Sequence, residues 1–242
     1  MNLQNRLSAK SFVKKEDKFF EKDFNRIMEL CIFAHSKMLE NENNLDGLDE
    51  ETLRSILMDY MQRNRGNYRL GRYAIDAESA EINNHITQGY CDLKISIPTN
   101  DDWSNEPLNY YIIECKRLNG ESTKNDLYIT KGIHRFVSEK YSRKMNIGGM
   151  IGFSVTNQNL QINNQCNVAS LIENINNKLI NKYKHNYNER LTATIIKLDF
   201  YNSFESKHKI KNRNYERNIK LIHLFLDNRN QGYKTLLKKV CV

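Results

Sequence analysis

Three charged side chains stand in two short stretches that otherwise favour burial. Asp92 lies in residues 89–97, and Glu114 and Lys116 lie in residues 110–118. Carboxylates are hard oxygen ligands of the kind that Mg²⁺ and Mn²⁺ prefer. An ammonium group beside them would stabilise negative charge that develops on a phosphate. These residue types suit metal-assisted hydrolysis of a phosphodiester, provided that the fold brings them together.

Both stretches are predicted to be β-strands, because each is short, rich in aromatic and branched residues, and bounded by polar residues. Side chains alternate along a strand, so Glu114 and Lys116 share one face and Cys115 projects from the other. Asp92 precedes Glu114 by 22 residues, which allows antiparallel pairing through a polar connection at residues 99–108. We therefore expect Asp92 to lie beside Glu114 and Lys116.

This arrangement resembles the PD-(D/E)xK nuclease superfamily, whose signature is an acidic residue on one strand and an acid-x-Lys triplet on the next. The acidic residue here is Asp92, and the triplet is Glu114-Cys115-Lys116. Cys91 stands where a proline usually precedes the first acid. The resemblance covers about residues 49–156. It implies an α/β fold with a restriction endonuclease-like core, in which helices flank a central mixed β-sheet.

The resemblance also implies a role for each residue of the signature. Asp92 and Glu114 would hold Mg²⁺, for which Mn²⁺ would substitute, and the backbone carbonyl of Cys115 would be a further metal ligand. Lys116 would activate water and stabilise the charge that develops on the phosphate. A lysine that acted as the base itself would need a strongly lowered pKa, so the sequence leaves the choice between these two roles open.

The resemblance implies that a glutamate of the first core helix often reaches the metal site, for which Glu50 is the choice, and Glu78 is a second candidate for the extra acid. Glu50 lies three and seven residues before Leu53 and Leu57 on a predicted helix, so it shares their inward face. A carboxylate is also favoured at a helix N-terminus for electrostatic reasons alone. Glu78 lies in a predicted strand at residues 73–82, where it is equally well explained as an edge-strand charge. The sequence does not choose between them.

The chain is basic, with 37 Lys and Arg against 29 Asp and Glu, a net charge of +8 and a pI near 9.1. This balance suits a polyanionic partner, and the acidic cluster within it favours nucleic acid over a membrane surface. A solvated basic surface is the alternative. The residues predicted to contact nucleic acid are Arg63, Arg65, Arg69 and Arg72, followed by Lys131 and Arg135. The resemblance places the helix that carries the last two, together with Tyr128, at the border of the active site.

The predicted organisation is an N-terminal helical extension, residues 1–44, followed by a nuclease-like domain, residues 45–242. A helix at 124–144 and a strand at 150–155 follow the acid-x-Lys strand, which indicates a parallel crossover. A helix at 160–184 comes next. Two strands, 192–201 and 220–226, are then predicted on either side of a basic segment at 207–217. His208 and His223 lack the spacing of metal ligands, so both are interpreted as structural.

Five scattered cysteines without a CxxC pair argue against a zinc ribbon and favour a reducing compartment. No early apolar segment resembles a signal peptide, and no apolar run approaches the length of a bilayer span. We therefore expect a cytoplasmic protein that does not enter a membrane.

The resemblance implies a metal-dependent DNA endonuclease, and a restriction or anti-phage defence nuclease fits a chain without helicase or methyltransferase motifs. It also implies a homodimer, and a defence-system protein is a further expected partner. Two hypotheses compete with this one. In the first, the chain is a catalytically silent nucleic-acid-binding or assembly subunit with a nuclease-like fold. In the second, it is a basic scaffold for an acidic protein. Tight DNA binding without cleavage under any divalent metal would favour the first of these.

Overall fold

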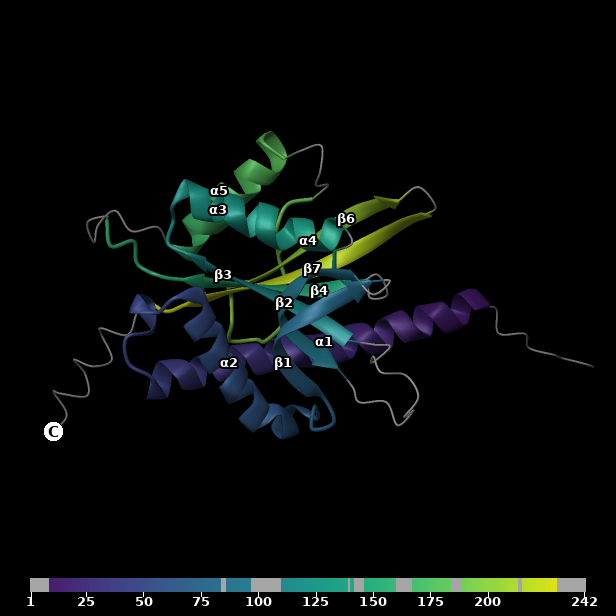
Figure 1. The fold of residues 1–242 in the computed structure, drawn as a ribbon, viewed down its shortest axis with the longest axis horizontal. Coiled ribbons are helices and arrows are strands. Elements are labelled where there is room, and N and C mark those ends of the chain that lie inside the picture. The colour runs from purple at the N-terminus through teal and green to yellow at the C-terminus, as the bar shows by residue number, and fades with distance from the viewer. Residues whose placement is uncertain are drawn as a thin grey trace, which may run out of the picture.

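The computed structural model describes residues 9–83, 86–96, 110–138, 140–141, 146–159, 167–183, 189–212 and 215–229. Within these residues a seven-stranded mixed sheet has the order β1-β2-β3-β4-β7-β6-β5 (Figure 1). The strands are β1 (Ala74–Asn83), β2 (Ile86–Ser96), β3 (Tyr110–Leu118), β4 (Ile147–Ser154), β5 (Thr192–Ala193), β6 (Ser203–Asn212) and β7 (Tyr215–Asp227). The predicted α/β class is confirmed.

The strands that carry the acidic signature are neighbours, as predicted. Strand β2 pairs with β3 in antiparallel fashion, with Leu93 opposite Ile113 and Ser96 opposite Tyr110. Strand β4 then pairs with β3 in parallel, as the predicted crossover requires, and β7 continues the sheet in parallel with β4. The two remaining neighbours, β6 and β5, are antiparallel. The centre of the sheet is therefore parallel and both of its edges are antiparallel.

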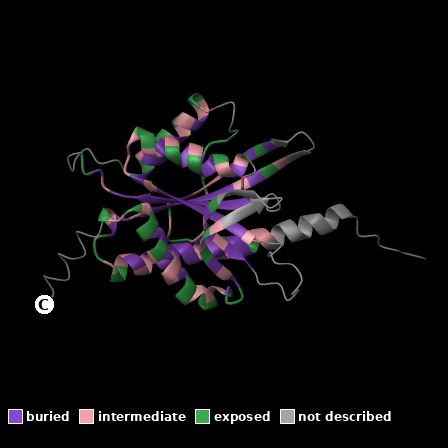
Figure 2. Cartoon of the chain, viewed as in Figure 1, coloured by how far each residue is buried: buried purple, intermediate pink, exposed green. Residues whose placement is uncertain are grey.

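Helices cover both faces of the sheet (Figure 1). On one face lie α1 (Ala9–Asn41) and α2 (Glu50–Asn64), and on the other lie α3 (Ser122–Tyr128), α4 (His134–Val137) and α5 (Val168–Asn181). Apolar side chains of α1, among them Phe24 and Met28, pack in one hydrophobic core with Leu93 and Ile113 of the sheet. Burial is concentrated along the strands and the helix faces toward them (Figure 2). The helix predicted as an N-terminal extension thus contributes to the core of the sheet.

The start of α2 is fixed by a side-chain cap. The carboxylate of Asp49 accepts a hydrogen bond of 2.8 Å from the backbone N–H of Thr52, which satisfies a donor that the first helical turn leaves free. Leu53 and Leu57 are fully buried against the sheet. Residues three or four positions apart share a helix face, so Glu50 is directed toward the same side as these leucines.

The helix predicted at residues 124–144 is shorter and interrupted. Helix α3 ends at Tyr128, a π-helical turn (η3) covers Ile129–Ile133, and α4 ends at Val137. Gly132 lies in the π-helical turn against the sheet, where an added Cβ would stand 2.4 Å from Cε of Met150. The close approach explains the glycine, and turns of this kind are frequent at functional sites. Residues 139 and 142–145 lie outside the described residues.

The prediction for the C-terminal part was partly wrong. Only Thr192–Ala193 of the expected strand 192–201 is a strand. The basic segment at 207–217 lies in β6 and β7, except for residues 213–214, which are outside the described residues. Exposed Lys207 and Lys209 alternate there with buried His208, which is the period of a strand. Helix α5 confirms part of the helix predicted at 160–184, of which residues 160–166 and 184 lie outside the described residues.

Both histidines interpreted as structural belong to one buried hydrogen-bonded chain. His223 Nδ1 lies 2.9 Å from the Tyr128 hydroxyl and Nε2 lies 2.8 Å from the Ser206 hydroxyl, which is also 2.8 Å from His208 Nε2. Burial lowers the pKa of His208 to about 4, and burial together with His208 lowers the pKa of His223 to about 3. Both rings are therefore neutral in the folded protein at neutral pH.

Acidification should consequently destabilise the fold. Each histidine takes up a proton on unfolding once the pH falls below its ordinary pKa of 6.5, so each lowers the free energy of unfolding by about 1.4 kcal/mol per pH unit down to its folded pKa. Urea denaturation at pH 6.5, 5.5 and 4.5 would show this. His208→Gln should reduce the dependence on pH by about one proton, because burial, the larger cause of its lowered pKa, still keeps His223 neutral over most of this range. An unchanged dependence would contradict the buried neutral state of His208.

Two observations concern the expected absence of a membrane span and the expected reducing compartment. No helix among the described residues is long and apolar enough to cross a membrane. Cys31, Cys91 and Cys115 carry buried free thiols, and burial raises the pKa of Cys31 and of Cys115 above the ordinary value. These two thiols therefore remain protonated and have a packing role.

Candidate active site

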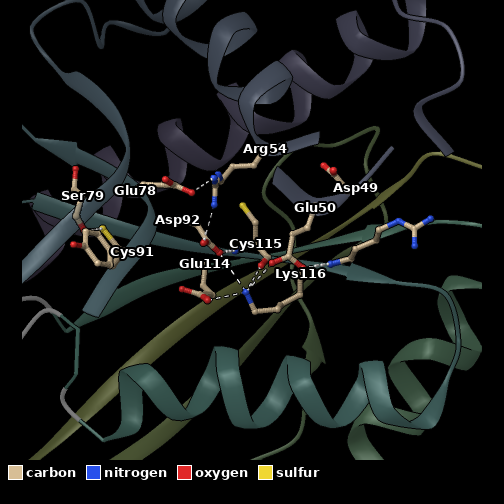
Figure 3. A network of polar contacts seen from close by, with 12 residues as sticks. Asp49, Glu50, Arg54, Glu78, Ser79, Cys91, Asp92, Glu114, Cys115 and Lys116 are labelled. Carbon is tan, nitrogen blue, oxygen red and sulfur yellow. Dashed lines mark hydrogen bonds and ion pairs between the residues drawn. The ribbon is translucent and has the colours of Figure 1, made fainter. Parts of the chain in front are cut away.

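The ammonium group of Lys116 lies among three carboxylates that come from three different elements (Figure 3). Lys116 Nζ is 2.8 Å from Glu114 Oε1 on its own strand β3, 3.4 Å from Asp92 Oδ2 on β2, and 3.1 Å from Glu50 Oε1 at the start of α2. The structure thus brings together Asp92, Glu114 and Lys116. It also brings Glu50, one of the two candidate glutamates, into contact with them.

Two backbone amides of β3 hold the carboxylates that come from other elements. Asp92 Oδ2 accepts a hydrogen bond of 2.7 Å from Cys115 N, and Glu50 Oε2 accepts one of 2.8 Å from Arg117 N. The pairing of β2 with β3 stops at Leu93 and Ile113, so the amides of β3 beyond this point can bond to side chains. The site occupies the place where the two strands part.

Glu114 is the most buried carboxylate of the site. Its Oε1 lies 2.7 Å from Arg135 Nη1, in addition to its contact with Lys116, and its side chain has no exposed surface. Oε2 is buried as well and has no hydrogen-bond partner among the described residues. Burial raises the pKa of Glu114 to about 7, against the opposing effect of Lys116 and with a further increase from Asp92. One oxygen of this carboxylate is therefore left for another donor or cation.

Lys116 remains protonated in this environment. Burial alone would lower the pKa of its ammonium group, but the negative charges of Glu114, Asp92 and Glu50 outweigh burial and raise the pKa above its ordinary value. A lysine in this state cannot accept a proton at neutral pH. Of the two roles that the sequence left open, the surroundings of Lys116 favour electrostatic stabilisation.

Arg54 belongs to the site, and sequence analysis missed it. Its Nη1 lies 3.1 Å from Asp92 Oδ1 and its Nη2 lies 2.7 Å from Glu78 Oε1, with only 7% of the side chain exposed. The signal in the sequence was its position four residues after Glu50, on the buried face of α2. Arg54 and the amide of Cys115 together fix both oxygens of Asp92.

Glu78, the other candidate glutamate, lies at the edge of this network and contacts Arg54 (Figure 3). Its side chain is 61% exposed, and its φ of 51° is left-handed, which a non-glycine residue adopts at a cost of about 1–3 kcal/mol. Ala77 pairs with Leu93, and Ser79 pairs with Cys91. Glu78, which lies between them, is therefore opposite Asp92. Backbone strain of this kind is concentrated at functional sites.

Four of the arginines predicted to contact nucleic acid lie away from these carboxylates. Arg63 pairs with Asp59 on the exposed side of α2, and Arg65 Nη1 donates to the carbonyl of Tyr73. Arg69 follows the 3-10 helix η2 (Arg65–Tyr68), and Arg72 is exposed. Arg63 is 13 residues beyond Glu50, which corresponds to about 20 Å along the helix. The structure does not bring this group to the site.

The three residues that were expected on the helix after β3 lie in different surroundings. Arg135 is a member of the site through Glu114, and it also bonds to the hydroxyl of Tyr141. Lys131 is exposed on the π-helical turn. Tyr128 is fully buried, and its hydroxyl is bonded to His223 inside the core.

The oxygen donors of the site have the chemistry that a divalent ion requires. Among the described residues, no group of three or more His, Cys, Asp or Glu side chains is arranged to hold a metal. Nevertheless, Lys116 Nζ contacts Asp92 Oδ2, Glu114 Oε1 and the backbone carbonyl of Cys115, which are the three ligands that the resemblance implies. These oxygens already converge on one cation, and the unpartnered Oε2 of Glu114 adds another. Hard oxygen donors of this kind fit Mg²⁺ or Mn²⁺.

No protein-family model, no curated protein and no solved structure matches this chain. The interpretation of the site therefore rests on its geometry.

Proposed function

We propose that this chain is a metal-dependent DNA endonuclease of the PD-(D/E)xK superfamily. The observation that supports this most strongly is the convergence of Asp92, Glu114 and Lys116 where β2 and β3 part. The order of elements around them, α2-β1-β2-β3-α3-β4 with β4 parallel to β3, agrees with a restriction endonuclease-like core. A role in restriction or anti-phage defence, a homodimeric state and a partner protein from a defence system follow from the resemblance.

In this proposal the acidic side chains bind the metal ion, and the basic side chains stabilise or orient negatively charged groups. Asp92, Glu114 and the carbonyl of Cys115 would hold Mg²⁺ or Mn²⁺, which supplies Lewis acid character and charge neutralisation when bound. Lys116 supplies a fixed positive charge beside the phosphate, where negative charge develops during hydrolysis. Arg54 orients Asp92, and Glu50 holds the ammonium group of Lys116 in place.

DNA is proposed as the substrate because the overall charge is +8 and the superfamily acts mostly on DNA. One observation favours a second candidate, a nucleic-acid-binding or assembly subunit without turnover. Each carboxylate of the site contacts a lysine or arginine, so the charges of the site are largely neutralised by the chain itself. A degenerate nuclease would retain this arrangement.

Incubation of the purified protein with supercoiled plasmid and with single-stranded DNA would test the proposal. Each substrate would be combined with Mg²⁺, with Mn²⁺ or with EDTA, and the products separated on gels. The expected result is cleavage with either metal and none with EDTA. DNA binding without cleavage under every divalent metal would contradict the proposed function and favour the subunit without turnover.

A further inference from the structure

A polar cavity of about 490 Å³ lies beside the candidate active site. It is formed by the start of α2, by the segments that follow β3 and β4, and by the first turn of α3. Strands β3 and β4 are parallel, so their carboxyl ends meet at this edge of the sheet. In open α/β sheets, the crevice outside the carboxyl ends of parallel strands is a usual place for ligands.

The cavity is connected to the site through Glu50. This residue lines the cavity, and its two carboxylate oxygens bond to Lys116 Nζ and to the backbone N–H of Arg117. Lys116 and Arg117 are consecutive in β3, and their side chains project from opposite faces of the strand. The cavity therefore lies on the Arg117 side of β3, and Glu50 is the residue that contacts both the cavity and the ammonium group of Lys116.

Two cations of the cavity, Arg117 and Lys124, form no ion pair within the part of the chain that the structure describes, although Arg117 interacts at longer range with the carboxylate of Asp49, which also lines the cavity. Arg117 Nη2 donates only to the backbone carbonyl of Asp46, at 3.2 Å, and Arg117 Nε is buried without any partner. Lys124, in the first turn of α3, forms no ion pair with a described residue. Arg54 and Lys116, by contrast, each contact two or three carboxylates. Two cations without an ion pair are thus available to an anionic group, in a lining that also carries the carboxylates of Asp49 and Glu50.

The remaining lining is rich in side-chain amides. Asn119, Gln158 and Asn159 line the cavity, and Gln158 and Asn159 are exposed on a turn. Asn119 Oδ1 accepts a hydrogen bond from Glu121 N, which holds that side chain in position. An amide presents both donors and an acceptor, the combination that reads the edge of a nucleobase. Anion-binding and base-binding groups therefore line the same cavity.

We propose that this cavity binds one nucleotide of the DNA strand that the active site cleaves, with its phosphate between Arg117 and Lys124 and its base against the amides. This inference rests on the proposed function, whose substrate it specifies. The volume lies within the range of roughly 300–1,000 Å³ that is usual for small-ligand sites. A base that is stacked and paired in a duplex cannot enter a cavity, so the nucleotide must be unpaired or extruded. Single-stranded DNA is consequently the preferred ligand.

The test is a binding measurement in EDTA, where no turnover occurs. Fluorescence anisotropy would give the affinity of a labelled single-stranded oligonucleotide and of a matched blunt duplex for the wild type, Lys124→Gln and Lys209→Gln. Lys209 is the matched control, because it is an exposed lysine on β6, which β4 and β7 separate from β3. Unlabelled dAMP and inorganic phosphate would be added as competitors.

Lys124→Gln should weaken single-strand binding about tenfold, whereas Lys209→Gln should change it less than about twofold. The wild type should bind the single strand more tightly than the duplex, and dAMP should displace it at lower concentration than phosphate does. Equal losses in the two variants, or equal binding of the two DNAs, would overturn the inference. Binding of dAMP without displacement of the oligonucleotide would also overturn it and would indicate a site for a free nucleotide.

The two measurements distinguish a failure of the nucleotide site from a failure of the proposed nuclease function. If the wild type cleaves no DNA but Lys124→Gln still weakens single-strand binding, the function fails and the nucleotide site stands. If cleavage requires metal while Lys124→Gln and Lys209→Gln bind DNA equally, the function stands and the nucleotide site fails.

Discussion

Replacement of Lys116 by alanine is expected to lower metal-dependent DNA cleavage by roughly 10²–10⁴-fold, the range found when a group that stabilises transition-state charge is removed. Among the described residues, the ammonium group of Lys116 is the one cation that lies within 3.4 Å of Asp92, Glu114 and Glu50 alike. Its loss removes the positive charge closest to the proposed position of the phosphate. Initial rates of plasmid nicking with Mg²⁺ would measure the effect.

The alanine variant should also be less stable, by about 3–5 kcal/mol, because it leaves the buried carboxylate of Glu114 with one cation fewer. The folded fraction must therefore be verified by circular dichroism at the assay temperature. Lys116→Arg retains the charge and should recover most of the stability but little activity, since a guanidinium group differs in shape and hydration. Lys209→Ala serves as the control for the loss of one lysine. Cleavage within tenfold of the wild type by folded Lys116→Ala would eliminate the assignment.

Replacement of Arg54 by methionine should lower the free energy of unfolding by about 3–5 kcal/mol. The guanidinium group is buried, and it is bonded to Asp92, whose side chain is only 13% exposed. Methionine fills a similar volume but leaves that carboxylate close to Glu114 without its second cation. The contact with Glu78 contributes little to this loss, because Glu78 is largely exposed. Urea denaturation at pH 7 would measure the change.

Arg63→Met is the matched control for this variant. Arg63 lies on the same helix and also pairs with a carboxylate, Asp59, but 68% of its side chain is exposed. Its replacement should change the free energy of unfolding by less than about 1 kcal/mol. Similar losses in the two variants would show that Arg54 has no special relation to Asp92. A larger fall in kcat than rise in KM for folded Arg54→Met would assign Arg54 to the positioning of Asp92.

The central part of the fold and of the site was predictable from local pattern. Short apolar stretches with charges at alternate positions identified the strands of Asp92 and Glu114, and the length of the connection indicated antiparallel pairing. The face shared by Glu114 and Lys116 follows from the period of a strand alone. Helical spacing placed Glu50 on an inward face, and the cap at Asp49 fixed the start of its helix.

The rest depended on partners that are distant in the sequence. An arginine within an amphipathic helix is ordinarily exposed, and only the fold shows that Arg54 meets Asp92, 38 residues away. The hairpin of β6 and β7 was missed because its buried face carries two polar residues, Ser206 and His208. Their burial is compensated by hydrogen bonds, since the Ser206 hydroxyl contacts both His208 and His223. The π-helical turn at Gly132 likewise reflects contact with Met150 on another strand.

The position of Lys116 among the carboxylates has a consequence for how the chain folds. Domains whose charged ligands repel one another until a metal arrives are unfolded without it, so that folding follows the supply of the ion. Here the chain provides its own counter-ion at the point where Asp92, Glu114 and Glu50 meet. The fold at this point therefore does not need a metal ion to offset the carboxylates, and a chelator that stopped the proposed cleavage should leave the protein folded.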